Sequence, residues 1–246
     1  MKTIGVIPAR YESSRLKAKV LSDIHGKPMI QHVWERAQKS RLLDDLLIAC
    51  DRDIILRAAE HFGAKVILSQ FPHFSGSDRI AEAVSNLEVD YVVNIQADEP
   101  LISPVVIDGL VELMKNPDCV MATAIKILDD KTELENPNVV KVVLDQNQNA
   151  IYFSRSCVPY NHHPVCVRPP TYYKHLGIYA YRKDFLLTFV RLRRGVLEEA
   201  EALEQLRALE AGYKIKTLLT DVHTISVDTL EDLQRVQEYL KDAVCD

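Results

Sequence analysis

The chain of 246 residues is 47% hydrophobic, which is enough to bury the core of one large α/β domain. Its net charge of −5, with acidic and basic residues interspersed, argues against a nucleic-acid surface, so no nucleic-acid partner is expected. No apolar run approaches the ~20 residues that cross a bilayer, so membrane insertion is not expected either.

The five cysteines are scattered along the chain without CxxC spacing. This pattern argues against a zinc site, and the odd number argues against a disulfide framework. The first apolar run is too short for a signal peptide. We therefore expect a cytoplasmic protein with reduced thiols.

The first thirty residues combine a strand with a cationic loop. An apolar run that begins at Thr3 leads into a polar loop with Arg10, Arg15 and Lys19, and residues 28–37 predict a helix. Three cations on one loop after a strand favour the binding of a polyanion.

The following residues continue an alternation of strands and helices. A strand over residues 46–51 precedes a helix over 53–62 and a strand over 65–68. This order predicts an α/β fold of Rossmann-like type, with a mostly parallel central sheet flanked by helices and ligands at the carboxyl ends of its strands. Because the GxGxxG fingerprint is missing, a nicotinamide or flavin cofactor is not expected.

Acidic residues follow the next strand. A polar turn at residues 74–79 opens a helix, and its serines are placed to cap it. The strand over residues 91–96 ends abruptly at Asp98 and Glu99, and a helix over 104–115 follows. Because parallel strands end at one edge of the sheet, we expect these acids to face the cationic loop.

The middle of the chain changes in character. Two β runs around a polar turn predict a hairpin over residues 140–155, and a strand resumes at 172–181. We expect one domain over residues 1–246 with a β-rich insert at about 139–190. This insert caps the crevice, forms a subunit interface, or does both.

The C-terminal part returns to helices. An apolar stripe predicts one helix over residues 197–211. A strand over 214–219 and an extended run over 224–228 precede the last helix, which begins near Thr229. Asp228 stands directly before that helix, so capping is its simplest role when it is considered alone.

A cationic loop that faces separated acids suits nucleotidyl transfer. Arg and Lys side chains can bind the β- and γ-phosphates of a nucleoside triphosphate, and one or two carboxylates can hold Mg²⁺ against the α-phosphate. The protein need not supply a covalent nucleophile, because a substrate hydroxyl attacks the α-phosphorus in line.

Several motifs of the chain occur in the order of one enzyme family. They are Ile7-Pro8-Ala9-Arg10-Tyr11, Gly26-Lys27-Pro28-Met29-Ile30, Ser75-Gly76-Ser77-Asp78-Arg79, Asn94-Ile95-Gln96-Ala97-Asp98-Glu99-Pro100, Tyr152-Phe153-Ser154-Arg155, His175-Leu176-Gly177-Ile178-Tyr179 and Leu203-Glu204-Gln205-Leu206-Arg207. Together they resemble the 3-deoxy-manno-octulosonate cytidylyltransferases over nearly the whole chain. Each motif alone is weak, and their shared order makes the resemblance specific.

The resemblance implies a nucleotidyltransferase fold and a reaction of CTP with the acidic eight-carbon sugar Kdo. The products would be CMP-Kdo and pyrophosphate, in lipopolysaccharide biosynthesis. It also implies a homodimer and Mg²⁺ as cofactor, with Asp98 and Asp228 as metal ligands. The catalytic residues implied are these two aspartates together with Arg10, Arg15 and Lys19, which would hold the triphosphate. The substrate-binding residues implied are Ala9, Ser75, Arg79, Gln96, Glu99, Tyr152, His175, Tyr179, Glu204 and Gln205, with Arg79 suited to the sugar carboxylate.

Two positions depart from the family pattern. Lys17-Ala18 stands where Pro-Gly is usual, and Ala97 stands where glycine is usual. Alanine costs on the order of 1 kcal/mol wherever the backbone needs a positive φ. Either these changes weaken CTP binding, or the positions never needed glycine.

Three alternatives to Kdo activation are considered at this level, and the weakest is a sugar transferase with an Asp-x-Asp metal motif, because Asp51-Arg52-Asp53 is more simply explained by helix capping. The first is another 2-keto acid sugar, such as 8-amino Kdo or a sialic-acid-like sugar. The second is a nucleotide-binding protein that has lost its catalytic activity, an alternative motivated by Ala18 and Ala97. A protein without catalytic activity does not need both predicted metal ligands. The presence of Asp98 together with Asp228 therefore argues against the second alternative.

Overall fold

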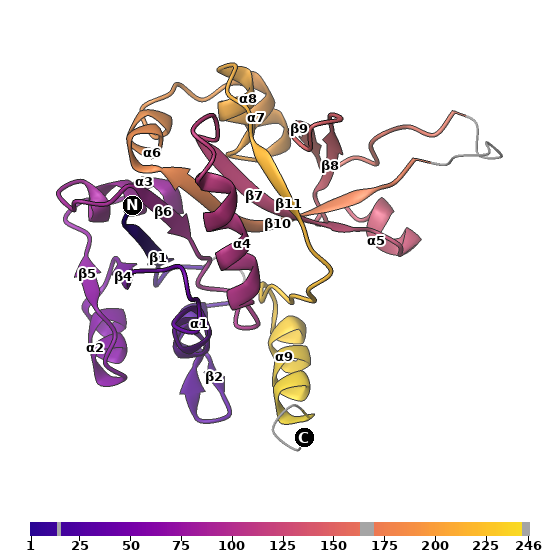
Figure 1. The fold of residues 1–246 in the computed structure, drawn as a ribbon. Coiled ribbons are helices and arrows are strands. Elements are labelled where there is room, and N and C mark those ends of the chain that lie inside the picture. Colours follow the sequence, from indigo (N-terminus) through magenta and orange to yellow (C-terminus); the bar gives the residue numbers. More distant parts are fainter. Residues whose placement is uncertain (14–15, 163–169, 243–246) are drawn as a thin grey trace.

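The structure is a computed structural model that describes residues 1–13, 16–162 and 170–242. Over these residues the chain forms one mixed sheet of nine strands with helices on both faces (Figure 1). The strands of the sheet are β1 (Thr3–Ala9), β4 (Asp45–Cys50), β5 (Val66–Leu68), β6 (Tyr91–Asn94), β7 (Met121–Ile127), β8 (Lys141–Leu144), β9 (Ala150–Ser154), β10 (Tyr173–Arg182) and β11 (Lys216–Leu219). Their order in the main path is β11-β7-β10-β6-β1-β4-β5.

Helices connect these strands, and a small two-stranded ribbon follows the first loop. The helices are α1 (Met29–Ala37), α2 (Asp53–His61), α3 (Gly76–Val84), α4 (Pro104–Met114), α5 (Lys131–Glu135), α6 (Lys183–Phe189), α7 (Val196–Glu201), α8 (Leu206–Glu210) and α9 (Leu230–Asp242). The ribbon is β2 (Asp23–Ile24) with β3 (Lys27–Pro28), preceded by the short 3-10 helix η1 (Lys19–Leu21). No helix in the described ranges is long and apolar enough to span a bilayer.

The N-terminal half folds as its alternating pattern predicts. Strand β1 pairs in parallel with β4 and β6, and β4 pairs in parallel with β5. Successive residues of β1 face opposite layers, so Val6 packs into one core and Ile7 into the other. Since β1 is buried on both faces, it reads as a continuous apolar run.

Two helical layers cover the sheet. Helices α1, α2 and α4 pack on one face through residues that include Trp34 and Ile107. Helices α3, α6 and α8 pack on the other face through Ile80, Phe185 and Leu206. The three layers place the carboxyl ends of β1, β4 and β6 at one edge, where the loops that follow them meet (Figure 1).

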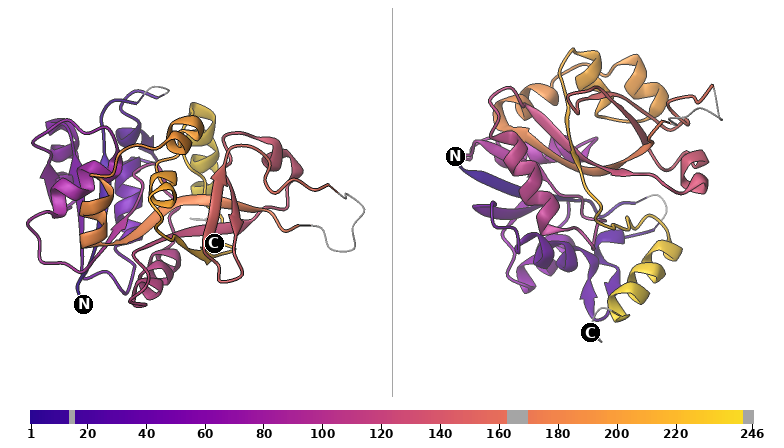
Figure 2. Two further views of the ribbon diagram at one scale, coloured as in Figure 1. Left: turned by 90° about the horizontal axis from the view of Figure 1, so that it is seen from above. Right: turned by 45° about the vertical axis from the view of Figure 1, so that its right-hand side comes forward.

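Strand β10 joins the expected β-rich insert to the main sheet. It runs antiparallel between β6 and β7, and its first residues also pair with β8. The predicted β8–β9 hairpin is confirmed, and this hairpin and the start of β10 project from the body of the molecule (Figures 1 and 2). Residues 139–190 are thus continuous with the sheet through a shared strand, and a single-domain organisation stays a prediction.

The prediction of one continuous helix over residues 197–211 is wrong. The chain forms α7 and α8 instead, and Ala202 between them is left-handed with φ 52°. This break lets Arg207 of α8 reach back to Glu198 of α7, where hydrogen bonds of 2.7 and 2.6 Å join the guanidinium to the carboxylate. Both side chains are buried, so the ion pair satisfies charges that a straight helix would leave apart.

Helix α9 returns the C-terminus to the first loop. Its cap is Thr229 and not Asp228, because Thr229 Oγ1 accepts from Asp232 N at 3.2 Å and the Asp232 carboxylate accepts from Thr229 N at 3.0 Å. Val236 of α9 packs with Met29 in a separate small core. The capping expectation for Asp228 is therefore wrong, and its side chain faces the site described next.

Candidate active site

Two cavities meet at the carboxyl ends of β1 and β6. The first has a volume of about 250 Å³ and contains Arg10, Lys19 and Arg79, and we call it the basic cavity. The second has a volume of about 940 Å³, and we call it the acidic cavity. Gln96 and Asp98 line both.

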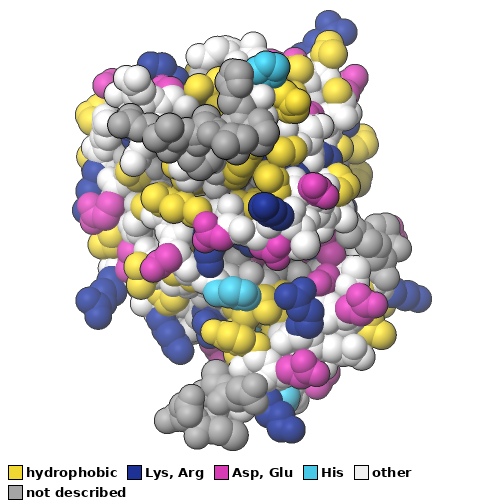
Figure 3. Space-filling view, turned by 90° about the vertical axis from the view of Figure 1, so that its right-hand side faces the viewer, with side chains coloured by type: hydrophobic (Ala, Val, Ile, Leu, Met, Phe, Trp, Pro, Cys, Tyr) yellow, Lys and Arg dark blue, Asp and Glu magenta, His cyan; other side chains and the backbone are white. Residues whose placement is uncertain are grey.

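The basic cavity is lined by Pro8, Arg10, Ser13, Lys19, Val20, His73, Phe74, Ser75, Gly76, Arg79, Gln96, Ala97 and Asp98. The acidic side chains of the second cavity are Asp98, Glu99, Asp130, Glu133, Asp228, Glu231 and Asp232. Acidic and basic side chains gather across the middle of one side of the molecule (Figure 3). The cavities therefore differ in charge although they share a wall.

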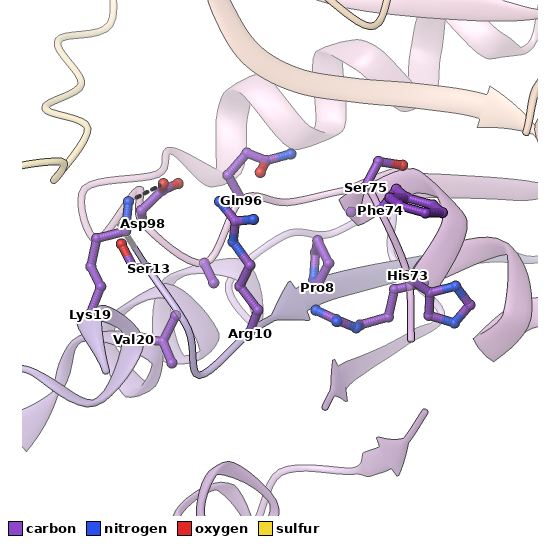
Figure 4. Close-up of a pocket in the computed structure, with 13 residues that line it drawn as sticks. Pro8, Arg10, Ser13, Lys19, Val20, His73, Phe74, Ser75, Gln96 and Asp98 are labelled. Carbon is purple, nitrogen blue, oxygen red and sulfur yellow. Dashed lines mark hydrogen bonds and ion pairs between the residues drawn. The ribbon is translucent and has the colours of Figure 1, made fainter. Parts of the chain in front are cut away.

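Lys19 joins the two predicted metal ligands where the cavities meet. Its Nζ donates hydrogen bonds to Asp98 Oδ2 at 2.7 Å and to Asp228 Oδ1 at 2.9 Å, and Figure 4 shows the first contact. Burial disfavours the charged amine, but the two carboxylates outweigh it and raise the pKa of Lys19. A backbone hydrogen bond of 2.9 Å from Val227 N to Asp98 O holds the segment before α9 against the β6 loop.

The carboxylates of Asp98 and Asp228 form a donor set that fits Mg²⁺. In nucleotide enzymes this ion is bound by one or two carboxylates together with substrate phosphates and water. Among the described residues, no group of three or more His, Cys, Asp or Glu side chains is placed to hold a metal. The pair therefore fits an ion that arrives with a phosphorylated substrate better than an ion held by protein alone.

The loop that carries Lys19 contains a left-handed alanine. Ala18 has φ 52° and ψ 34°, which glycine adopts freely and alanine adopts at a cost of about 1–2 kcal/mol. Ala97 is not among the positive-φ residues of the described chain, so its backbone does not need glycine. Position 18 is thus the departure from the family pattern that has a conformational cost. Arg15, which was predicted on the same loop, lies outside the described residues.

The start of α3 forms another wall of the basic cavity. Ser75 caps this helix, because its Oγ accepts from Asp78 N at 3.1 Å and the Asp78 carboxylate accepts from Ser75 N at 3.1 Å. A Cβ on Gly76 would lie 3.2 Å from Pro8 Cγ, so glycine permits the close approach of α3 to β1. A helix N-terminus at this place favours a bound anion.

Arg79 lines the basic cavity, and contacts with Ala9 and Asp51 hold its guanidinium in place. Its Nη1 donates to Ala9 O at 2.9 Å, and its Nη2 lies 3.5 Å from Asp51 Oδ2. Its Nε has no hydrogen-bond partner among the described residues. Because Arg79 does not line the acidic cavity, its position does not favour pairing with a sugar carboxylate there.

Glu99 presents a buried carboxyl group to the acidic cavity. Burial, and then the charge of Asp98, raise the pKa of Glu99 to about 8. Its Oε2 has no hydrogen-bond partner within the described part of the chain. Glu99 is therefore protonated at neutral pH in the metal-free protein and can donate a hydrogen bond. Gln96 has an amide that donates to Asn94 Oδ1 at 3.0 Å.

Strand β10 supplies two rings to the acidic cavity. His175 and Tyr179 both line it, with ring centroids 5.3 Å apart. Burial lowers the pKa of His175 to about 3 and raises the pKa of Tyr179 well above its usual value. Both side chains are neutral near pH 7, so they can bind a ligand through neutral hydrogen bonds and packing.

Four of the described residues that were predicted for the site lie outside the linings of both cavities, namely Ala9, Tyr152, Glu204 and Gln205. Ala9 contributes its carbonyl oxygen, which accepts from Arg79. The hydroxyl of Tyr152 lies 3.4 Å from Glu201 Oε1. Ser77 Oγ donates to Glu204 Oε2 at 3.0 Å, so the Glu204 carboxylate lies behind the first turn of α3. Glu204 Oε1 and Gln205 Nε2 are buried without a hydrogen-bond partner among the residues described. The structure brings this pair close to the basic cavity but not into its lining.

Sequence reasoning missed Asp51 as a site residue. Its carboxylate accepts from Tyr11 N at 2.9 Å and faces Arg79, so it orders the start of the cationic loop. The available signal was its place at the end of a predicted strand, the same signal that singled out Asp98.

Comparisons with known proteins agree with this geometry. The sequence model of a family described as cytidylyltransferase matches residues 4–215. The 3-deoxy-manno-octulosonate cytidylyltransferase of Solibacter usitatus is 46% identical over 244 residues, which cover 99% of this chain and 96% of that protein. Its counterpart in Fusobacterium nucleatum is 47% identical over 244 residues, which cover 98% of each protein.

Solved structures show the same relationship. A CMP:2-keto-3-deoxy-manno-octonic acid synthetase complexed with CTP superposes with a TM-score of 0.93 at 40% identity, covering 99% of this chain and 100% of that one. A glucose-1-phosphate thymidylyltransferase from Bacillus anthracis has a TM-score of 0.68 at 19% identity, covers 98% of this chain and 96% of its own, and shares the fold alone. The chain therefore belongs to the 3-deoxy-manno-octulosonate cytidylyltransferase family.

Proposed function

We propose that the protein transfers a cytidylyl group from CTP to 3-deoxy-D-manno-octulosonate (Kdo) and releases pyrophosphate. The observation that carries this proposal is the contact of Lys19 with Asp98 and Asp228 where a basic and an acidic cavity meet. The names of the relatives and the CTP complex of the solved relative support these substrates. The relatives do not favour another 2-keto acid sugar.

The basic cavity would hold the triphosphate. Arg10 and Lys19 extend into it from the loop after β1, and Figure 4 shows Arg10 directed toward Gln96 and Lys19 toward Asp98. Guanidinium and ammonium groups neutralise the charge that grows on the leaving pyrophosphate. The sequence adds Arg15 to this set.

The transfer would proceed in one displacement. A hydroxyl oxygen of Kdo attacks the α-phosphorus of CTP, and a new O–P bond forms. The bond between the α-phosphorus and the bridging oxygen breaks, and pyrophosphate leaves with the electron pair. The hydroxyl proton passes to solvent water.

Asp98 and Asp228 would hold Mg²⁺. Bound there, the ion would neutralise phosphate charge and lower the pKa of the attacking hydroxyl. Lys19 contacts both carboxylates in the structure, so substrate binding would move its ammonium from a carboxylate to a phosphate oxygen. Gln96, Glu99, His175 and Tyr179 would bind the sugar, since they line the acidic cavity.

We also propose that the protein is a cytoplasmic homodimer that serves lipopolysaccharide synthesis. The apolar side chains of Ile127, Ile151 and Leu219 are 42%, 56% and 46% exposed. Ile151 lies on the hairpin strand β9, and Ile127 and Leu219 are the last residues of β7 and β11. Such side chains favour burial against a partner. Light scattering of the purified protein measures the oligomeric state, and a monomer at micromolar concentration would rule the dimer out.

The function is tested by pyrophosphate release from CTP, Mg²⁺ and Kdo. Asp98→Asn should lower the rate by at least ~100-fold, which is the usual effect of losing one group that stabilises charge in the transition state. Asp118→Asn is the matched control, since Asp118 is an exposed aspartate that lines neither cavity, and it should keep the wild-type rate. If the wild-type protein releases pyrophosphate with 8-amino Kdo but not with Kdo, the proposal that Kdo is the sugar substrate is wrong. If calorimetry shows tight binding of CTP and no acid sugar is turned over, the proposal that the protein is an enzyme is wrong.

A further inference from the structure

Thr123 of β7 and His175 of β10 form a hydrogen-bonded pair beside the acidic cavity. Thr123 Oγ1 lies 2.9 Å from His175 Nε2. The Thr123 side chain is fully buried. The imidazole is packed edge-on against Phe153 at 5.2 Å and beside Tyr179 at 5.3 Å, so its ring plane is fixed.

The direction of this hydrogen bond follows from the carbonyl groups around Thr123. Its Oγ1 lies 2.7 Å from Ile178 O and 3.3 Å from Leu176 O. A carbonyl oxygen only accepts, and a hydroxyl has one proton to donate. The Thr123 proton is therefore used on Ile178 O, and Oγ1 turns a lone pair to the ring. The opposite direction would place lone pairs of two oxygens against each other at 2.7 Å.

The backbone of β10 explains why Thr123 is needed here. The register between β10 and β7 shifts between Leu176 and Tyr179, which marks a β-bulge. A bulge interrupts the ladder of backbone hydrogen bonds and redirects side chains, often next to a site. Thr123 supplies a hydroxyl to the carbonyl of the bulge and at the same time fixes His175.

We propose that Thr123 is a positioning residue that holds His175 as the Nε2–H tautomer, so that Nδ1 accepts a hydrogen bond from a hydroxyl group of the sugar. Among the described residues Nδ1 has no hydrogen-bond partner, and His175 lines the acidic cavity. A neutral imidazole with one bare nitrogen is an acceptor, which suits the many hydroxyl groups of Kdo. The identity of the ligand rests on the proposed function, whereas the tautomer does not.

The tautomer is measured by ¹⁵N NMR of the histidine-labelled protein without substrate. The His175 signals are assigned by their loss in His175→Gln. We expect a protonated Nε2 and a bare Nδ1 in the wild type and in Thr123→Ser, which keeps the hydroxyl. Thr123→Val should give a mixture of tautomers. A wild-type ring with Nδ1–H, or as imidazolium at pH 7, would overturn the proposal.

Steady-state kinetics test the contact with the sugar. Thr123→Val should raise KM for Kdo about tenfold, the effect of one hydrogen bond, and leave KM for CTP unchanged. Thr217→Val is the matched control, because Thr217 pairs with Thr123 in the neighbouring strand, is 1% exposed and donates to Gln148 O at 2.9 Å. Thr123→Ser and Thr217→Val should keep KM for Kdo.

Two kinetic outcomes overturn the inference in different ways. An equal rise in KM for Kdo in Thr123→Val and Thr217→Val would show that Thr123 acts only through the stability of the fold. A wild-type protein that does not turn over Kdo would overturn the proposed function and the contact with the sugar, while the NMR result would still decide the tautomer. These two failures are therefore distinguishable.

Discussion

Replacement of Ala18 by glycine should stabilise the protein. With φ 52° and ψ 34°, Ala18 occupies a region that costs a residue with a Cβ about 1–2 kcal/mol. Glycine removes this cost but gives the unfolded chain more conformational entropy, about 0.5–1 kcal/mol. We expect Ala18→Gly to raise the free energy of unfolding by about 0.5–1 kcal/mol. For a chain of this size, a gain of 1 kcal/mol corresponds to a rise of about 2–4 °C in Tm.

Urea and thermal denaturation of three glycine variants measure the effect. Ala202 is the matched control, since it has the same φ of 52° far from the cationic loop, and Ala202→Gly should gain as much. Ala97→Gly should lose stability, because Ala97 has no positive φ to relieve. Lys19 keeps its backbone in Ala18→Gly, so KM for CTP should stay within about twofold. If Ala202→Gly is stabilised and Ala18→Gly is not, the reasoning about the loop is refuted.

Three other side chains give predictions about stability. The buried Nζ of Lys141 donates to three backbone carbonyl oxygens, so Lys141→Met should lower the free energy of unfolding in urea by about 3 kcal/mol, and a loss under about 1 kcal/mol would contradict this. Arg207→Met removes both hydrogen bonds between a guanidinium and the buried Glu198 carboxylate and leaves it a 3.9 Å ion pair with the exposed Arg194, so it should cost about 3 kcal/mol in the same assay. Adding Glu198→Gln should give partial recovery, and no recovery would argue against the ion pair. The pKa of Glu99 rises from 4.5 to about 8, so the folded protein keeps a proton that the unfolded chain has lost, and stability falls as pH rises through this window. Glu99→Gln should flatten that fall in Tm in metal-free buffer, and an unchanged slope would show that another group causes it.

The parallel half of the sheet could be predicted because its signals are local. Each strand is a short apolar run, and each intervening helix has its own stripe and stop. The place of β10 between β6 and β7 could not be predicted, because strand order depends on contacts between distant segments. The break at Ala202 is hidden for a similar reason. The apolar stripe continues through it, and a buried ion pair between Glu198 and Arg207 outweighs that local pattern.

Part of the site could be predicted from the rule that parallel strands end at one edge. Lys19 and Asp98 meet as expected, and Asp228 joins them although it lies 209 positions from Lys19. The motifs also singled out Tyr152 and Glu204. Their places depend on side-chain partners in α7 and α3, which no spacing along the chain reveals.

The antiparallel insertion of β10 has a consequence for synthesis on the ribosome. Strand β6 is buried along its whole length in the finished protein, and its two neighbours are β1 and β10. A nascent chain that has made β1 and β6 must wait for many further residues before β10 covers the second edge of β6. An apolar edge exposed for that time can pair with other chains and is a natural target for chaperones. Since β10 also carries His175, the same step of maturation would lower the risk of aggregation and complete one wall of the acidic cavity.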